Sequence, residues 1–341
     1  MSDNNRNSIE DTSLVRIFGI DYKDGTYTVS ILYNNSANSE DEKSFKSLSG
    51  EGESVFAAYD AIRKKSEYFP SLSQIKYFII GKEAAQNGIK EALDFAVRHE
   101  QIKTDVEILI ASDGTAKTLI ENNKQEGSFL GDTLQTSQHK EMKTVRHIDS
   151  TLLAMQKHLA LRSDSFLIVN LNSSKPIFID GYAVFEDNKL VDTIDANTAL
   201  GIDFLLGNVR SVPVFADGFS SIIIDIKAKK KAVIKNGKLS YSIKTDFSTA
   251  IREVNTDELN TDLDFLEEKQ NEYVNALINK AVLYLKNTNL DLIDLKSLFN
   301  SYCPKEWRKY KESFEIKNVD FIIDTSSTIA KTFDFQLTEE V

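Results

Sequence analysis

The stretch IKYFIIG, residues 75–81, decides the fold class of this chain of 341 residues. It is a short and almost continuous apolar run that ends at a glycine, which is typical of a strand buried on both faces of a sheet. Helical patterns flank it at residues 55–65 and 83–100, the second interrupted by Gly88, and another buried strand follows at residues 106–111. This alternation predicts an α/β layer in which some strands pair in parallel.

Two hairpin patterns border this layer. The first spans residues 14–33 around Asp24-Gly25, a dipeptide that tolerates the positive φ of a tight turn, and the second spans residues 177–194. We expect these two hairpins to pair with each other into one small sheet, with the α/β layer inserted between them.

The rest of the chain has a different pattern. A long strand at residues 220–233 leads through Asn236-Gly237, a preferred hairpin dipeptide, into a second strand. The longest helix pattern follows at residues 258–285, and a final strand at residues 319–323. Because 341 residues exceed one average domain, the length alone favours two or three folding units.

The composition excludes several classes of protein. Hydrophobic residues make up 41% and charged residues 27%, which fits a soluble globular protein with a core and not a disordered chain. The 52 acidic and 41 basic residues leave a net charge of −11, whereas a dedicated nucleic-acid binder needs an excess of Lys and Arg. No run of 18 apolar residues occurs, so we expect no membrane-spanning helix.

One glycine motif deserves comparison with a nucleotide-binding loop. Gly50-Glu51-Gly52 precedes a helix pattern, as a phosphate-binding loop does. The third glycine of such a loop is absent, and Glu51 and Glu53 would repel a phosphate. We therefore interpret this segment as a helix-entry turn in which Ser54 caps the following helix.

No metal site is predicted. The spacing of the four histidines does not match a helical zinc site, and we interpret them as packing or solvent-facing residues: His99, His139, His147 and His158. Residues 255–264 are rich in Asn, Thr and Asp, but they lack the glycine of a calcium loop, and helix capping explains them. We expect neither a metal nor a cofactor.

A catalytic site is not predicted either. Cys303 is the only cysteine, so no intramolecular disulfide can form. Pro304 could open a helix that lowers the pKa of this thiol, but we favour a small buried hydrophobic residue. No nucleophile motif accompanies His147 and Asp149. We therefore expect no enzyme, and a hydrolase that uses Cys303 or a His–Asp pair is the hypothesis to exclude.

One dense basic segment stands out in this acidic chain, and its members are the candidate contact residues Lys227, Lys229, Lys230 and Lys231. Two interpretations remain open. Lysines often protect an exposed strand edge from pairing with other chains. Alternatively, they contact anionic lipid headgroups or an acidic partner.

Several segments, in this order, carry a family resemblance. They are Gly19-Ile20-Asp21 with Asp24-Gly25-Thr26-Tyr27, residues 77–98, residues 181–191, and Pro304-Lys305-Glu306-Trp307 with the strand at residues 319–323. Together they resemble the C subunit of bacterial spore nutrient germinant receptors, the Ger(x)C lipoprotein family. Each motif is short, but their order and spacing extend from about residue 14 to residue 333.

The resemblance implies a function without catalysis. It implies a lipoprotein, anchored through a lipid such as palmitate to the outer face of the spore inner membrane, that assembles with A-type and B-type integral membrane subunits to trigger germination. The resemblance carries over no defined binding residues, and from the net charge of −11 we expect no nucleic-acid partner. The alternative is an extracytoplasmic module that captures a small nutrient on its own, in a cleft between domains.

The sequence departs from the family pattern in two respects. The last strand of the family often ends near a glycine, and Ser326-Ser327-Thr328-Ile329 has none. The family carries a lipid-modified cysteine near its mature N-terminus, and no cysteine precedes Cys303 here. We expect the polar residues 1–12 to form a flexible leader at the point where the anchor would join.

The predicted fold class is α+β (mixed α/β), with three domains that are each a β-sheet flanked by helices, the first of them discontinuous. The expected division is the leader at residues 1–12, a small N-terminal domain at residues 13–48 plus 175–211, an inserted α/β domain at residues 49–174, and a C-terminal α+β domain at residues 212–337.

Overall fold

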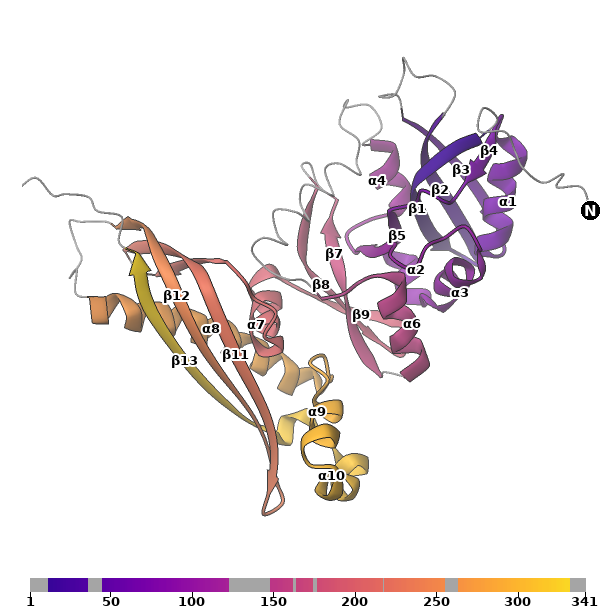
Figure 1. The fold of residues 1–341 in the computed structure, drawn as a ribbon. Coiled ribbons are helices and arrows are strands. Elements are labelled where there is room, and N and C mark those ends of the chain that lie inside the picture. The colour runs from indigo at the N-terminus through magenta and orange to yellow at the C-terminus, as the bar shows by residue number, and fades with distance from the viewer. Residues whose placement is uncertain are drawn as a thin grey trace, which may run out of the picture. The chain divides into compact units, whose positions relative to one another are not determined.

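The structure is a computed structural model that describes residues 12–35, 45–122, 148–161, 164–173, 177–216, 218–254 and 263–331. The described residues form two compact units, whose boundary along the chain lies between Asp195 and Ala196 (Figure 1). In both units a β-sheet is flanked by helices, which confirms the predicted mixed α/β class.

The first unit is built on one mixed sheet. Its described strands follow the order β3-β2-β1-β5-β6-β7-β8-β9, and β4 pairs with β1 beside β5. In chain order they are β1 (Thr12–Lys23), β2 (Thr26–Asn35), β3 (Lys46–Gly52), β4 (Phe69–Ser71), β5 (Tyr77–Gly81), β6 (Glu107–Ala111), β7 (Ser165–Asn172), β8 (Phe178–Glu186) and β9 (Lys189–Ile194). The central strands β1, β5, β6 and β7 are parallel, as the alternation of helix and strand predicts.

The expected pairing between the two hairpins is wrong. The β1–β2 hairpin and the β8–β9 hairpin lie at opposite ends of the sheet, with β5, β6 and β7 between β1 and β8. All five residues of β5 are buried, and strands that are apolar on both faces need a neighbouring strand on each side and helices above and below. The hairpins supply those outer neighbours.

The division into three domains remains a prediction.

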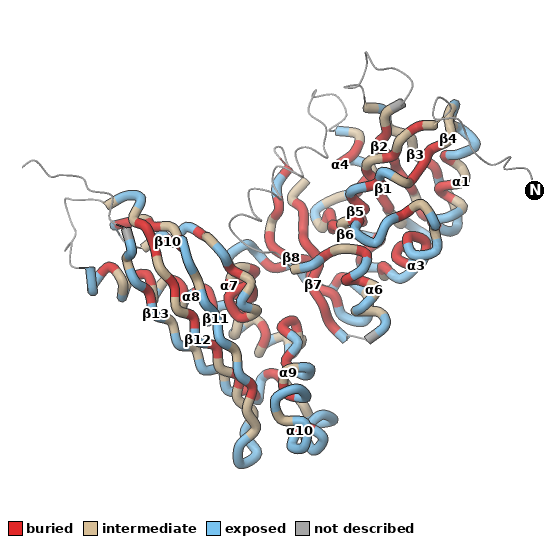
Figure 2. The backbone as a smooth tube through the Cα atoms, in the orientation of Figure 1, coloured by how far each residue is buried: buried red, intermediate tan, exposed pale blue. Residues whose placement is uncertain are grey.

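Helices cover both faces of this sheet: α1 (Val55–Lys65), α2 (Lys82–Asn87), α3 (Lys90–Arg98), α4 (Ala116–Asn122) and α6 (Leu152–Leu161). Phe18 of β1 stacks on Phe78 and Phe95, and it lies beside Tyr59 of α1, so α1 and α3 share one face. Its neighbour Gly19 points the other way, toward Ala116 and Ile120 of α4. Buried residues are concentrated in the central strands between these helices (Figure 2).

The helix expected at residues 83–100 is two helices in the structure. Gly88 has a φ of 128°, which only glycine adopts easily, and it separates α2 from α3. The next residue, Ile89, is fully buried and donates its backbone N–H to Asn188 O. The glycine therefore redirects the chain so that an apolar side chain enters the core.

The second unit contains a four-stranded sheet in the order β10-β11-β12-β13, with β12 and β13 parallel. Its described elements are α7 (Ala196–Leu206), β10 (Pro213–Ala216), β11 (Phe219–Lys235), β12 (Lys238–Val254), α8 (Leu263–Thr288), α9 (Leu295–Tyr302), α10 (Pro304–Tyr310), the 3₁₀ turns η2 (Lys311–Ser313) and η3 (Ile316–Asn318), and β13 (Asp320–Lys331). The predicted turn at Asn236-Gly237 is confirmed, since both residues have positive φ.

One face of this second sheet is covered by α8. Tyr241, Ile243 and Phe247 alternate along β12 as buried residues on that face, where Ser327 Oγ donates to Glu267 O of α8. The opposite face carries the exposed and half-buried side chains of Ser242, Lys244 and Asp246. None of the described helices is both long enough and apolar enough to cross a membrane.

Candidate functional site

The glycine motif lies in a strand, which the sequence interpretation missed. Gly50 and Gly52 belong to β3 and pair with Val29 and Tyr27 of β2. A Cβ on Gly52 would lie 2.6 Å from Ala58 N, and one on Gly50 would overlap Ala58 O, so α1 packs directly on the strand backbone. The motif therefore serves close helix–strand packing.

The predicted cap of α1 is confirmed. Ser54 Oγ accepts the backbone N–H of Ala57 at 3.1 Å, and Ser54 has the extended conformation of an N-cap residue. The helix spans Val55–Lys65, and it buries the apolar face that its sequence pattern indicates.

Two histidines lie in the described part of the chain, and both pack against aromatic rings. The ring of His99 lies 5.8 Å from Tyr59 and 5.6 Å from Phe95, and burial lowers the pKa of His99. His158 stacks on Phe166 at 5.1 Å. The packing interpretation is confirmed for these two histidines, whereas His139 and His147 lie outside the described residues.

Cys303 has a structural contact with the edge of β11. Its thiol is half-buried and donates a weak hydrogen bond to Ala232 O of β11, at 3.7 Å. Among the described residues, no group of three or more His, Cys, Asp or Glu side chains could hold a metal ion. Of the segment at residues 255–264, only Leu263 and Asp264 are described, and they begin α8.

The motif Gly19-Ile20-Asp21 joins the sheet to α4. The carboxylate of Asp21 accepts the N–H groups of Ala116 and Lys117, both at 2.8 Å, at the start of that helix. Burial raises the pKa of Asp21, while these two backbone bonds oppose the rise. A Cβ on Gly81 would overlap the Asp21 carboxylate, so the contact also requires a glycine at the end of β5.

The four candidate lysines do not share one surface. Lys227, Lys229 and Lys231 pair with β12 residues of the open face, and they are exposed. Lys230 lies on the α8 side, where its ammonium donates to Leu206 O at the end of α7, at 2.8 Å. Burial lowers the pKa of Lys230, and Asp294 opposes that effect.

These lysines lie on a partly protected strand edge. β10 pairs with β11 only at residues 219–222, so the remainder of β11 is at the edge of the sheet. The end of α9 covers part of this edge. Tyr302 Oη donates to Lys230 O at 3.3 Å, and the Cys303 thiol donates to Ala232 O at 3.7 Å. This geometry is compatible with edge protection, and it leaves the outer lysines accessible.

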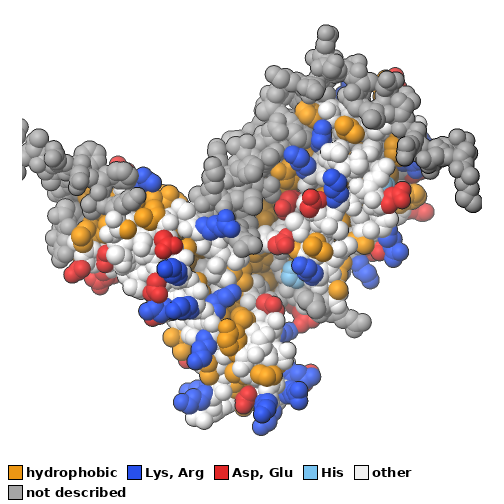
Figure 3. All heavy atoms as spheres, viewed as in Figure 1, with side chains coloured by type: hydrophobic (Ala, Val, Ile, Leu, Met, Phe, Trp, Pro, Cys, Tyr) orange, Lys and Arg blue, Asp and Glu red, His pale blue; other side chains and the backbone are white. Residues whose placement is uncertain are grey.

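A shallow hollow of about 480 Å³ lies beside them on the open face. Its lining includes Lys229, Lys231, Tyr302 and Ile322. Lys244 also lines it and forms ion pairs with Asp246 at 3.5 Å and with Asp324 at 3.8 Å. Figure 3 shows further Lys and Arg side chains at the end of this unit where the β11–β12 turn and α10 lie.

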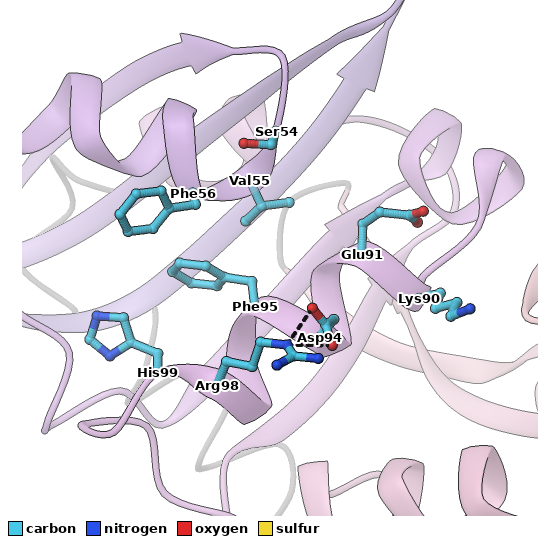
Figure 4. Close-up of a pocket in the computed structure, with 9 residues that line it drawn as sticks. All are labelled: Ser54, Val55, Phe56, Lys90, Glu91, Asp94, Phe95, Arg98 and His99. Atoms are coloured by element: carbon cyan, nitrogen blue, oxygen red, sulfur yellow. Dashed lines mark hydrogen bonds and ion pairs between the residues drawn. The ribbon is translucent and has the colours of Figure 1, made fainter.

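A second candidate site is a groove of about 590 Å³ between the start of α1 and α3 (Figure 4). Its apolar part is formed by Val55, Phe56 and Phe95, and Phe56 is 58% exposed. Charged side chains of α3 line its rim, together with Ser54 and His99. They are Lys90, Glu91, Asp94 and Arg98.

The polar groups of the groove are arranged for contact with a bound ligand. Arg98 Nε donates to both oxygens of Asp94, at 2.8 and 2.9 Å. The buried Nδ1 atom of His99 has no hydrogen-bond partner among the described residues. This combination suits a molecule with an apolar body and polar ends. The sequence carried no signal for the groove, because its residues come from two helices that only the fold brings together.

Comparisons with known proteins give two family matches that together cover most of the chain. Residues 5–170 match the model described as "Spore germination protein N-terminal domain", and residues 180–332 match "Spore germination B3/GerAC like, C-terminal". No curated protein matches the chain in sequence.

The fold is similar to that of a solved structure titled "Crystal Structure of the GerBC protein". The TM-score is 0.62 and the sequence identity is 18%, and the similarity covers 92% of this chain and 97% of that chain. At this identity the likeness shows a shared fold.

Proposed function

The chain belongs to the GerAC-like family of spore germination proteins, the family of germinant receptor C subunits, and on that premise we propose that it is a non-enzymatic lipoprotein subunit of a nutrient germinant receptor. In this role it assembles with an A-type and a B-type integral membrane subunit and is held by an N-terminal lipid at the outer face of the spore inner membrane. The assembled receptor triggers germination in response to a nutrient.

One observation carries the proposal. Both family models match, in order, and the matches reach from residue 5 to residue 332. The packing roles of Gly50 and Gly52, His158 and Cys303 agree with a scaffold, since each of these candidate catalytic or phosphate-binding features has a structural contact. The exposed surface of the protein is therefore the candidate region for contact with partners.

The test is co-purification of the lipid-anchored protein with its candidate membrane subunits from spores. We expect both subunits to elute with the tagged protein in mild detergent. The matched control is the same tagged protein in spores that lack one of the membrane subunits. If neither subunit is retained under conditions in which the receptor stays intact, the proposal of a receptor subunit is wrong.

A second candidate function is capture of a small nutrient by the chain itself. The groove between α1 and α3 supports it, because its volume of about 590 Å³ lies in the range of about 300–1,000 Å³ that is usual for ligand pockets. This groove lies within the first unit and not in a cleft between domains, where the sequence interpretation expected it.

Calorimetry and thermal shift against amino acids and sugars test this second function. A ligand at 100 times its Kd should add about 2.7 kcal/mol to the free energy of unfolding. The variant Phe56→Ala should abolish that gain, because it removes an exposed ring from the groove, whereas Val97→Ala on an exposed position of α3 outside the lining should retain it.

A further inference from the structure

Charge is strongly segregated in this acidic chain. Residues 227–244 contain seven lysines and no acidic residue, and residues 296–311 contain four lysines, Arg308 and one acidic residue, Glu306. These two segments carry a net charge of +11, although the whole chain carries −11. Only the first five positions of the first segment form an obvious basic run in the sequence.

The fold joins these two segments into one end of the second unit, which we call the basic end (residues 227–244 and 296–311). Tyr302 Oη and the Cys303 thiol contact carbonyls of β11. A Cβ on Gly237 at the hairpin turn would lie 3.4 Å from Tyr310 Oη, so the end of α10 lies beside that turn. Figure 3 shows Lys and Arg side chains around this end, with few acidic ones among them.

Three lysines of the basic end, Lys229, Lys231 and Lys235, are available to an external anion. All its basic residues except Lys230 are exposed. Within the described ranges, Lys244 is paired with two aspartates and Lys311 with Glu312, whereas no carboxylate is paired with Lys229, Lys231 or Lys235. The three carboxylates of these pairs offset only part of the net charge of +11 that the two segments carry.

The shape of the basic end favours a flat anionic surface over an extended chain. The hairpin turn forms the outermost point of this end of the unit (Figure 1), and the hollow beside it is shallow. A nucleic-acid strand or an acidic peptide needs a groove that follows it, and the hollow contains the carboxylate of Asp324. Tyr302 is 53% exposed, and tyrosine is suited to the headgroup region of a bilayer.

From these observations we infer that the basic end binds anionic phospholipid headgroups. Each Lys or Arg near an anionic bilayer contributes about 1 kcal/mol of attraction, which is about fivefold in affinity. The rest of residues 196–341 carries a net charge of −14 and is repelled by the same bilayer, so the two charge regions orient the second unit with its hairpin turn toward the lipid. This inference does not depend on the proposed receptor function.

The test is sedimentation of the full chain, without any lipid anchor, with vesicles. We expect binding to mixed vesicles of phosphatidylglycerol and phosphatidylcholine and none to phosphatidylcholine alone. Binding should vanish at 1 M salt, because the Debye length falls from about 10 Å at 0.1 M to about 3 Å. Absence of binding to the anionic vesicles at low salt overturns the inference.

A charge-matched pair of variants locates the surface. Replacing Lys229, Lys231 and Lys235 by Gln should weaken vesicle binding about a hundredfold, at about fivefold per lysine. Replacing the exposed Lys23, Lys82 and Lys103 of the first unit by Gln makes the same change in net charge and should leave binding unchanged. Equal losses in both triple variants would contradict a localised surface.

Two further readouts separate this inference from its alternatives. Lys305→Gln, Arg308→Gln and Lys309→Gln on α10 should also weaken vesicle binding, since the surface includes that helix. Thermal unfolding of each variant shows whether it is folded, and an unchanged unfolding temperature with lost binding supports the inference. Binding to polyglutamate with no binding to anionic vesicles would assign the surface to an acidic polypeptide and overturn it.

Discussion

At the scale of single residues, His99 illustrates how burial tunes a side chain in the groove. Its ring packs against Tyr59 and Phe95, and burial lowers its pKa because the charged imidazolium is poorly solvated there. Glu100 opposes this effect and Arg63 adds to it. The neutral ring is therefore the form that the folded state prefers.

The first prediction concerns the stability of the wild type as the pH falls. A group with a lowered pKa in the folded state binds fewer protons there than in the unfolded chain, so the free energy of unfolding should fall as the pH drops below 6.5 and through the lowered pKa. His99→Phe keeps an aromatic ring and removes the titration. Urea unfolding of both proteins across this range should give a shallower pH dependence for the variant, and parallel curves would contradict the assignment.

At the scale of elements, helices touch strands and other helices through glycine. Gly50 and Gly52 admit the backbone of α1, and Gly201 of α7 admits the backbone of α8 near Leu277. A glycine in a strand or helix is unfavourable by itself, at about 0.5–1 kcal/mol, so these positions are explained by packing and not by propensity.

We predict that Gly50→Ala destabilises the protein by about 1–3 kcal/mol, because the new methyl group overlaps Ala58 O and displaces α1. Gly114→Ala is the matched control. Its Cβ would lie 3.5 Å from Ser173 Oγ, an ordinary contact, so its effect should stay within about 0.5 kcal/mol. Chemical denaturation measures both variants. Equal effects would show that α1 adapts without cost.

A second prediction at this scale separates the two sides of β11. Lys230→Ala should lower the free energy of unfolding by about 1 kcal/mol, because the hydrogen bond to Leu206 O and the packing of the lysine stem are lost together. Relief from burying the charge offsets part of that loss. Lys229→Ala on the open side should change stability by less than about 0.5 kcal/mol. The reverse order of the two effects would contradict this assignment of faces.

At the scale of the whole molecule, the position of α7 decides where the chain can be divided. The predicted domain boundary between residues 211 and 212 assigns this helix to the first domain. In the structure α7 packs on α8 through Gly201, and Leu205 O and Leu206 O accept hydrogen bonds from Tyr241 and Lys230. The second unit accordingly begins at Ala196.

We therefore predict that a fragment of residues 196–341 unfolds cooperatively, whereas a fragment of residues 212–341 is much less stable. Removing α7 exposes the apolar face of α8 and leaves the buried Tyr241 hydroxyl without its acceptor, which costs about 1–3 kcal/mol by itself. Circular dichroism with thermal unfolding compares the two fragments. Equal stabilities would instead support the boundary at residues 211 and 212.

Local patterns in the sequence were enough to predict the elements that depend on neighbouring residues. The buried strand at IKYFIIG, the Ser54 cap and the Asn236-Gly237 turn all follow from short-range chemistry, because caps, turns and apolar periods involve residues a few positions apart. The family resemblance instead rests on the order and spacing of short motifs along the chain. Strand β3 was missed since a polar edge strand with two glycines has no apolar period.

Only the tertiary structure decided which distant segments meet. Strand pairing placed the two hairpins at opposite ends of one sheet, because the apolar strands β5 and β6 require neighbours on both sides. Packing separated Lys230 from Lys227, Lys229 and Lys231, and it joined α10 to the hairpin turn. Such contacts depend on complementary shapes across many intervening residues, whereas a sequence pattern reports only its immediate neighbours.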